Sequence, residues 1–228
     1  MKNGAIILFS GGIDSTTALY WGMREFAEVV PVIIDYSQKH RIEVTHAVKI
    51  AELNGLAFKL IRFPLNDILS SALLNSERAI PDSLATAKDE RGIPLTYVPF
   101  RNGIFLSLAA GIAESMEFPN IITGFNLIDT PDYPDTTIEF TGKIEAAINE
   151  GTSASITGEP FRIWTPLIEK SKKEIIELGI ELGADYSYSI SCYRGEEFPC
   201  LNCPSCEIRS QAFKELGMED PLIKRLTR

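Results

Sequence analysis

The feature that most constrains the fold is a run of five apolar residues, 5–9, that is followed almost at once by paired glycines. Such a run, bounded by turn-forming residues, is typical of a strand buried on both faces of a parallel sheet. From Ser15 onward the apolar pattern predicts a helix. The loop between them therefore precedes a helix start, where unpaired N–H groups and the helix dipole attract anions. We expect a phosphate site there, with Gly11 and Gly12 allowing close approach and Ser10 adding a hydroxyl.

This segment, residues 10–15, is called the phosphate loop below. Its sequence, Ser-Gly-Gly-Ile-Asp-Ser, has neither the lysine of a Walker loop nor the Gly-x-Gly-x-x-Gly of dinucleotide-binding proteins. It resembles the pyrophosphate loop of the ATP pyrophosphatases. The resemblance implies cleavage of ATP between the α and β phosphates, with pyrophosphate held in the loop and AMP passed to an acceptor oxygen. A plain strand-to-helix turn is the alternative that the residues alone leave open.

Apolar runs alternate with helical patterns along the chain, which is the sequence sign of a parallel sheet covered on both faces. We predict further strands at 29–34, 58–63, 95–100, 120–124 and 162–164, and helices at 41–54, 104–116, 138–150 and 171–182. In such a sheet, ligands bind beyond the carboxyl ends of the strands. We therefore expect the residues that follow predicted strands to share one crevice: Ser10, Asp35, Arg101, Gly124 and Thr165.

Composition narrows the class of protein. The chain has 228 residues, of which 45% are hydrophobic, enough for one large α/β domain with a small annex. The net charge of −9 disfavours a nucleic-acid partner and favours a small substrate. No apolar run is long enough to span a bilayer, and no leader-like segment precedes the first strand. We expect a cytoplasmic protein with no membrane partner.

The cysteines all lie near the C-terminus: Cys192, Cys200, Cys203 and Cys206. Two overlapping Cys-x2-Cys steps are typical of metal binding where thiols stay reduced. Four thiolates around one ion form a closed tetrahedral site, so we predict one structural zinc that fastens residues 192–206 to the main domain. An iron–sulfur cluster is the main rival, because the last three cysteines have part of a ferredoxin spacing. Reduced core cysteines and disulfides are further alternatives.

The loop and the cysteines together resemble the QueC family of queuosine biosynthesis, and the resemblance covers nearly the whole chain. The matching segments are 9–17, 35–40, 92–94, 98–102, 123–124, 133–135, 139–140, 165–167 and 191–193, with Asp129, Lys172 and the later cysteines. Three positions differ, since the family usually has glycine where Phe100 stands and Cys-Arg where Thr136 and Thr137 stand. The resemblance implies a doubly wound parallel α/β sheet of the adenine nucleotide α-hydrolase-like, PP-loop type at 1–185. A small helical subdomain that binds zinc would follow at 186–228.

The activity that the resemblance implies is an ATP-dependent ligation. The substrates would be 7-carboxy-7-deazaguanine and ammonia, and the product 7-cyano-7-deazaguanine, formed through adenylated carboxylate and amide intermediates. Mg²⁺ would bridge the phosphates, and the family resemblance suggests a homodimer. Three alternatives stay open: a QueC-like ligase that attaches a deazaguanine to another amine such as a protein N-terminus, a PP-loop enzyme that modifies tRNA, and a nucleotide-binding sensor.

The implied roles divide into three groups of residues. ATP would be held by Phe9, Ser10, Gly11, Gly12, Asp14, Ser15, Thr16, Asp35 and Tyr36. Catalysis would fall to Arg101 and Lys172, which neutralise phosphate charge, and to Asp14, which orients the loop, meets Mg²⁺ or favours the helix start. The deazaguanine would be held by Asn102, Asp129, Tyr133, Asp135 and Glu139, since carboxylates accept paired N–H donors; loop capping is the alternative for the aspartates. His40, between Lys39 and Arg41, is expected to be solvated rather than a proton carrier.

Overall fold

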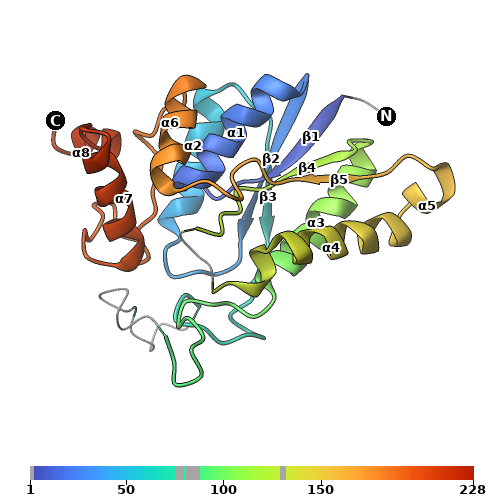
Figure 1. Ribbon diagram of the computed structural model, residues 1–228, viewed down its shortest axis with the longest axis horizontal. Helices are drawn as coiled ribbons and strands as arrows, with labels where there is room; N and C mark the ends of the chain where they lie inside the picture. The colour runs from blue at the N-terminus through green and yellow to red at the C-terminus, as the bar shows by residue number, and fades with distance from the viewer. Residues whose placement is uncertain (1–2, 75–79, 81–87, 129–131) are drawn as a thin grey trace.

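The structure is a computed structural model, and it describes residues 3–74, 80, 88–128 and 132–228 (Figure 1). Its strands are β1 (Gly4–Leu8), β2 (Glu28–Asp35), β3 (Lys59–Arg62), β4 (Asn120–Ile122) and β5 (Arg162–Trp164). Its helical segments are α1 (Ile13–Glu25), α2 (Ile42–Leu53), α3 (Arg101–Met116), the 3-10 turn η2 (Pro134–Thr136), α4 (Ile138–Gly151), α5 (Ala154–Thr157), α6 (Lys172–Glu181), α7 (Pro204–Glu215) and α8 (Pro221–Leu226). None of the described helices is both long and apolar enough to cross a membrane.

The strands form one parallel sheet in the order β3-β2-β1-β4-β5 among the described residues. Helices α1, α2 and α6 cover one face, and α3 and α4 cover the other (Figure 1). The apolar run of β1 serves both faces, because alternate side chains point to opposite sides of a strand. Ile6 packs in the core with α3, and Ile7 packs in the core with α1, each with no exposed area. The predicted doubly wound parallel sheet is therefore confirmed.

Most predicted elements match the observed ones to within three residues. The expectation that Arg101 follows a strand is wrong, because the described residues before it form turns and Arg101 is the first residue of α3. Pro94 and Pro99 interrupt this apolar stretch, and proline withholds the N–H that a sheet ladder needs. The backbone turns into the helix at Phe100, whose φ of 54° is left-handed. Its N–H donates to the Tyr97 hydroxyl at 3.1 Å.

Residues 186–228, called the tail below, carry α7 and α8 at one edge of the molecule beside α6 (red in Figure 1). Tyr186, Ala212 and Phe213 are buried in the same core as α1 and α6. The tail also reaches the phosphate loop, because the Ile190 N–H donates to the Gly11 carbonyl at 3.0 Å. It therefore shares the core of the α1 face and one wall of the region beyond β1.

Candidate functional site

A cleft of about 330 Å³ lies beyond the carboxyl ends of β1, β2 and β4. The strands β2 and β3 are added on one side of β1, and β4 and β5 on the other, so the topological switch point lies between β1 and β4. Open sheets of this type bind ligands at such a point. The phosphate loop, the loop after β4 and the tail all contribute lining residues, among them Ser10, Gly124 and Tyr193. A crevice is thus present where topology predicts it, with the tail as an additional wall. Of the five residues expected to share it, Ser10, Arg101 and Gly124 line it, whereas Asp35 and Thr165 do not.

The phosphate loop is shaped to receive an anion. Gly11 has a φ of 77° and lies against α2, where an added Cβ would be 2.9 Å from the Ala47 backbone nitrogen. Gly12 is the N-cap of α1 and offers no side chain, so the helix start is open to a ligand. The Ser10 and Ser15 hydroxyls are 3.1 Å apart at this opening. The loop therefore combines hydroxyl donors with the unpaired N–H groups of the first turn of α1.

Gly124 explains how the loop after β4 reaches this point. An added Cβ there would lie 2.9 Å from the Ser15 backbone nitrogen, which is closer than real Cβ contacts come. A glycine is therefore required for the loop to pass across the start of α1.

Lys172 and Asp14 come together although 158 residues separate them. Lys172 Nζ lies 2.5 Å from Asp14 Oδ1, and both side chains line the cleft. Lys172 is the first residue of α6, and Ser171 caps this helix in a capping box with Glu174. The cap fixes where α6 starts, and thereby places a lysine ammonium beside the phosphate loop.

Arg101 places a second fixed cation in the cleft. Its Nη1 donates to the Tyr36 hydroxyl at 3.3 Å, and its guanidinium lies 5.8 Å from the centre of the Tyr36 ring. Burial acts to lower the pKa of Arg101, but Tyr36, Asp135 and Tyr133 outweigh it and raise the pKa above its usual range. Burial raises the pKa of Tyr36 to about 12. Near neutral pH the pair is therefore an arginine cation and a neutral phenol.

Asn102 and Tyr133 also line the cleft, whereas Asp135 stands behind it. Asp135 Oδ2 accepts the backbone N–H of Asn102 at 2.9 Å, and the side chain is almost fully buried. A carboxylate at this place stabilises the N-terminus of α3. Tyr133 is held by a 2.6 Å hydrogen bond between its hydroxyl and Thr96 Oγ1. Asp135 thus fixes the helix that carries Arg101 and Asn102.

Of the remaining predicted site residues, some line the cleft and others do not. Phe9 lines the cleft, while Gly11, Thr16 and Asp35 lie next to it without forming its wall. Asp35 holds the chain beyond β2, because Oδ2 accepts from Arg41 Nη2 at 2.7 Å. Glu139 is exposed on the first turn of α4 and is not among the lining residues. Asp129 lies outside the described residues.

Two of the three positions where this chain differs from the usual family sequence, Phe100 and Thr137, have local structural roles. Phe100 adopts a left-handed conformation that suits glycine, and its ring packs against Gly103 and against Phe140, with ring centres 5.9 Å apart. Thr137 is the N-cap of α4, and its hydroxyl accepts the Phe140 N–H at 3.1 Å. Thr137 therefore caps α4, and Phe100 forms the left-handed turn that leads into α3.

The expectation that His40 is solvated is wrong. Its side chain is 7% exposed and lines the cleft, with Nε2 3.0 Å from Glu43 Oε2. The tail covers it, because the Tyr193 ring lies 6.1 Å from the imidazole and Gly195 packs on the His40 backbone. Glu43 was not predicted at all. The His-x-x-Glu spacing at a helix start was the available signal.

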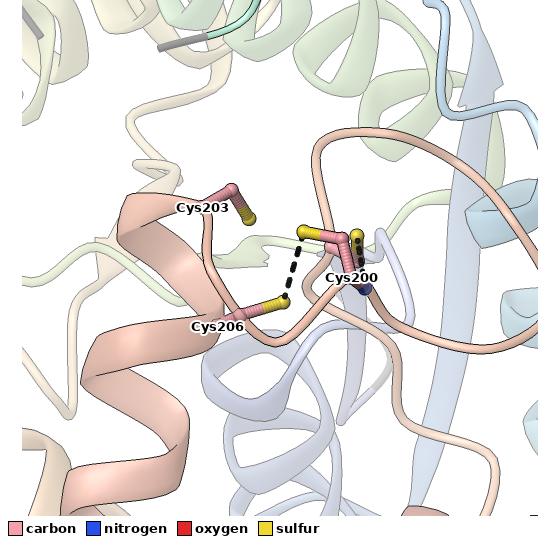
Figure 2. A group of neighbouring side chains, drawn as sticks. Cys200, Cys203 and Cys206 are labelled. Atoms are coloured by element: carbon pink, nitrogen blue, oxygen red, sulfur yellow. Dashed lines mark hydrogen bonds between the residues drawn. The ribbon is translucent and has the colours of Figure 1, made fainter. Parts of the chain in front are cut away.

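The four cysteines form a candidate metal centre. Their Sγ atoms all lie within 4.8 Å of one another. Cys203 is the N-cap of α7 and Cys206 lies in its first turn, while Cys200 precedes them in the loop (Figure 2). The Sγ atoms of Cys200 and Cys206 are 3.9 Å apart. A tetrahedral ion with Zn–S bonds of about 2.3 Å requires sulfurs about 3.8 Å apart, so the donor set fits one zinc-sized ion.

Hydrogen bonding also favours bound thiolates at this centre. The Cys200 N–H donates to Cys192 Sγ at 3.4 Å. Leu201 adopts a left-handed φ of 62°, which folds the Cys200–Cys203 step back on itself. Cys192, Cys203 and Cys206 are buried, and four clustered thiolates need a cation to balance their charge.

An all-parallel sheet, with a glycine–serine phosphate loop at its switch point and two cations beside it, defines an α/β nucleotide-binding protein of the PP-loop class. The family model described as "Queuosine biosynthesis protein QueC" matches residues 4–217. The chain belongs to this family.

Individual relatives align with this chain over nearly its full length. The chain is 39% identical over 231 residues to the 7-cyano-7-deazaguanine synthase of Psychrobacter arcticus, covering 96% of this chain and 89% of that protein. It is 40% identical over 220 residues to the 7-cyano-7-deazaguanine synthase of Pseudomonas putida, covering 95% and 96%. Among solved structures it is similar to a 4-thiouridine synthetase in complex with RNA and ATP. That match has 22% identity and a TM-score of 0.49, and it covers 94% of this chain and 50% of that one. We infer no function from it.

Proposed function

We propose that this protein is an ATP-dependent ligase that converts 7-carboxy-7-deazaguanine and ammonia into 7-cyano-7-deazaguanine. The chain is 39% and 40% identical, over nearly its full length, to synthases of that name, which supports this choice of substrate. The observation that carries the chemistry is that the phosphate loop, Lys172 and Arg101 line the same 330 Å³ cleft. A loop that binds pyrophosphate beside two cations suits transfer of AMP to an acceptor oxygen.

The first step activates a poor electrophile. A carboxylate oxygen of the substrate attacks the α-phosphorus of ATP, the bond from that phosphorus to the bridging oxygen breaks, and pyrophosphate leaves. The phosphate loop would hold the departing pyrophosphate. Lys172 and Arg101 would stabilise the charge that builds up on the phosphates in the transition state. The product is an acyl adenylate, in which AMP is a good leaving group.

Ammonia then replaces AMP and gives the amide. A second ATP adenylates the amide oxygen, and loss of AMP together with the remaining N–H protons forms the nitrile. Two molecules of ATP are consumed per turnover. Asn102 and Tyr133, which share the cleft, would hold the deazaguanine with Asp129; Asp135 would act through Asn102, and Glu139 would take part only from the rim.

Two metals belong to this proposal. Mg²⁺ would neutralise the triphosphate, with Asp14 as the carboxylate beside the phosphate loop. Zinc would occupy the cysteine centre as a structural ion. The sulfur distances support one ion, because a cluster of several irons holds its thiolates farther apart than a single ion does.

The same proposal covers the domains, the partners, the oligomeric state and the location of the enzyme. Residues 1–185 would form the ATP pyrophosphatase domain, and the tail would form a zinc-binding subdomain. A net charge of −9 supports a small-molecule substrate rather than nucleic acid. We further propose a homodimer located in the cytoplasm.

The test is direct synthesis. Purified protein, Mg²⁺-ATP, 7-carboxy-7-deazaguanine and ammonium should yield the nitrile by mass spectrometry, with AMP and pyrophosphate released. Lys172→Met should slow pyrophosphate release by about 100-fold or more, because a charge that stabilises the transition state is lost. Lys173→Met is the matched control, since Lys173 is exposed and pairs with Glu177 on the same helix. Amide ligation to another amine, or no pyrophosphate release, would refute the proposal, and metal analysis of the same sample distinguishes zinc from iron.

A further inference from the structure

A hydrogen-bonded group beside the cleft is not used by the chemistry above. Glu43 Oε2 lies 3.0 Å from His40 Nε2, and Glu43 Oε1 accepts from Gln38 Nε2 at 2.8 Å. Gln38 in turn accepts the Tyr36 N–H at 2.9 Å. The Glu43 side chain is 16% exposed and lines the cleft. This network therefore holds a carboxylate at the cleft wall in a defined position.

Asp14 and Arg209 in the cleft are each paired with a side chain of opposite charge, whereas the Glu43 carboxylate is paired with no lysine or arginine among the described residues. Asp14 is paired with Lys172, and the lining residue Arg209 is paired with Asp220 outside the cleft. Within the part of the chain that the structure describes, Glu43 has His40 and Gln38 as partners and no lysine or arginine. A small cation that enters the cleft would thus be attracted to Glu43.

His40 adds a second observation that points to proton chemistry. The side chain is almost fully buried, and its Nδ1 atom has no hydrogen-bond partner among the described residues. Buried polar atoms without a partner are rare, and they need an explanation such as a catalytic role. An imidazole bonded to a carboxylate at one nitrogen, with the other nitrogen unused, can take up a further proton.

We propose that Glu43, supported by His40, is the site that binds ammonium and removes its proton. This inference rests on the proposed function. Ammonium is mostly protonated near neutral pH and has no lone pair in that form, so an enzyme that uses it must first accept a proton. Ammonium also fits the geometry better than Mg²⁺ does, because both Glu43 oxygens already accept N–H donors and a cation that donates hydrogen bonds extends the same pattern.

The step balances as follows. Ammonium transfers one proton to the Glu43–His40 pair and becomes ammonia. The nitrogen lone pair forms a bond to the acyl carbon of the adenylate, and the bond from that carbon to the phosphate oxygen breaks with its electron pair on AMP. The second proton lost by nitrogen goes to the AMP phosphate. The proton on the Glu43–His40 pair returns to water before the next turnover.

The experiment separates adenylation from ammonia use. Exchange of labelled pyrophosphate into ATP, with the carboxylate substrate and without ammonium, reports adenylation alone. Glu43→Gln should keep this exchange within about twofold, while the KM for ammonium chloride rises by about tenfold or more, as expected for loss of a charged hydrogen bond. Hydroxylamine is largely uncharged near neutral pH, so its nitrogen has a free lone pair and no proton has to be removed before it attacks. Hydroxamate formation by Glu43→Gln should therefore stay close to the wild-type rate.

Two further variants sharpen the result. Glu52→Gln changes an exposed glutamate on the same helix and should alter neither KM nor exchange. His40→Gln keeps a donor for Glu43 but takes up no proton, so its KM for ammonium should rise by less than that of Glu43→Gln.

The outcomes distinguish the two levels of the proposal. An unchanged KM for ammonium in Glu43→Gln overturns this inference. Parallel loss of exchange, hydroxamate formation and amide formation also overturns it, because the role of Glu43 would then be structural. Absence of exchange in the wild-type protein refutes the proposed function itself, and with it this inference.

Discussion

The phosphate loop and the tail meet at one cleft, but they are held there by different means. The phosphate loop follows β1, whose Ala5, Ile6 and Ile7 are fully buried, so the hydrophobic effect of the whole sheet fixes it. The tail places only a few side chains in the core around this sheet, among them Tyr186 and Phe213, and adds specific contacts: four cysteines, an ion pair and one buried hydroxyl pair. Sheet burial is distributed over many residues, whereas we expect single changes in the tail to have large effects. The predictions below test this difference.

The largest effect is expected at the metal centre. Cys203→Ser removes a buried ligand, and the free energy of metal binding is also folding free energy for a segment with little core of its own. The free energy of unfolding should fall by about 4 kcal/mol or more, and bound metal should fall well below one ion per chain. Denaturant titration and metal analysis measure the two quantities. Limited proteolysis should cut the tail first and leave the sheet intact.

Ser210→Ala is the matched control, because Ser210 is an exposed residue on the same helix. It should keep both the metal and the stability of the wild type. If Cys203→Ser also kept them, the tail would be held by packing alone, and its contrast with the sheet would disappear.

The same difference explains how much the sequence could reveal. The strands of the sheet were predictable because each is a local apolar run bounded by glycine, proline or polar residues. The clustering of the four cysteines was predictable from their spacing. The burial of His40 was not, because Tyr193 and Gly195, which cover it, follow about 150 residues later. The turn before Arg101 was missed because an apolar stretch with two prolines resembled a strand.

The second prediction concerns the ion pair within the tail. Arg209 is 4% exposed and bonds both oxygens of Asp220, at 2.6 and 2.7 Å, while its Nη1 donates to the Ser189 carbonyl at 2.8 Å. Arg209→Met leaves the Asp220 charge and the Ser189 carbonyl without this partner. The free energy of unfolding should fall by about 3 kcal/mol, the usual cost of breaking a buried pair from one side.

Asp220→Asn measured alone and together with Arg209→Met completes a double-mutant cycle. The double variant should lose less than the sum of the two single losses. Additive losses would mean that the ion pair contributes no coupling, and the tail would then resemble the sheet in how it is held.

The third prediction concerns the junction between α6 and the tail. The Tyr186 hydroxyl lies 2.6 Å from Thr17 Oγ1 and passes directly over Gly179, where an added Cβ would overlap it. Gly179→Ala should displace Tyr186 and lower the free energy of unfolding by about 2 kcal/mol, as overpacking does in buried sites. Gly142→Ala is the control within α4, since nothing lies near its Cβ position. It should raise stability by about 0.5 kcal/mol, because alanine favours a helix. Equal effects at both positions would refute the proposed tight junction.

The smallest effect is expected where α2 meets the tail. His46 Nδ1 lies 2.7 Å from the Tyr188 carbonyl. Burial lowers the pKa of His46 below its usual 6.5, and the charges of Arg225 and Arg209 lower it further. The hydrogen bond to Tyr188 and the charge of Glu197 act in the opposite direction but are outweighed. The unfolded chain then binds a proton below pH 6.5 that the folded protein does not. Stability from this residue is therefore complete above pH 6.5 and is lost as the pH falls below it. His46→Asn keeps a donor for Tyr188 without a titrating ring. Between about pH 7.5 and pH 5.5 its free energy of unfolding should fall less than that of the wild type, by up to about 1 kcal/mol. A wild-type protein that loses no more stability than the variant would show that His46 is protonated in the folded state.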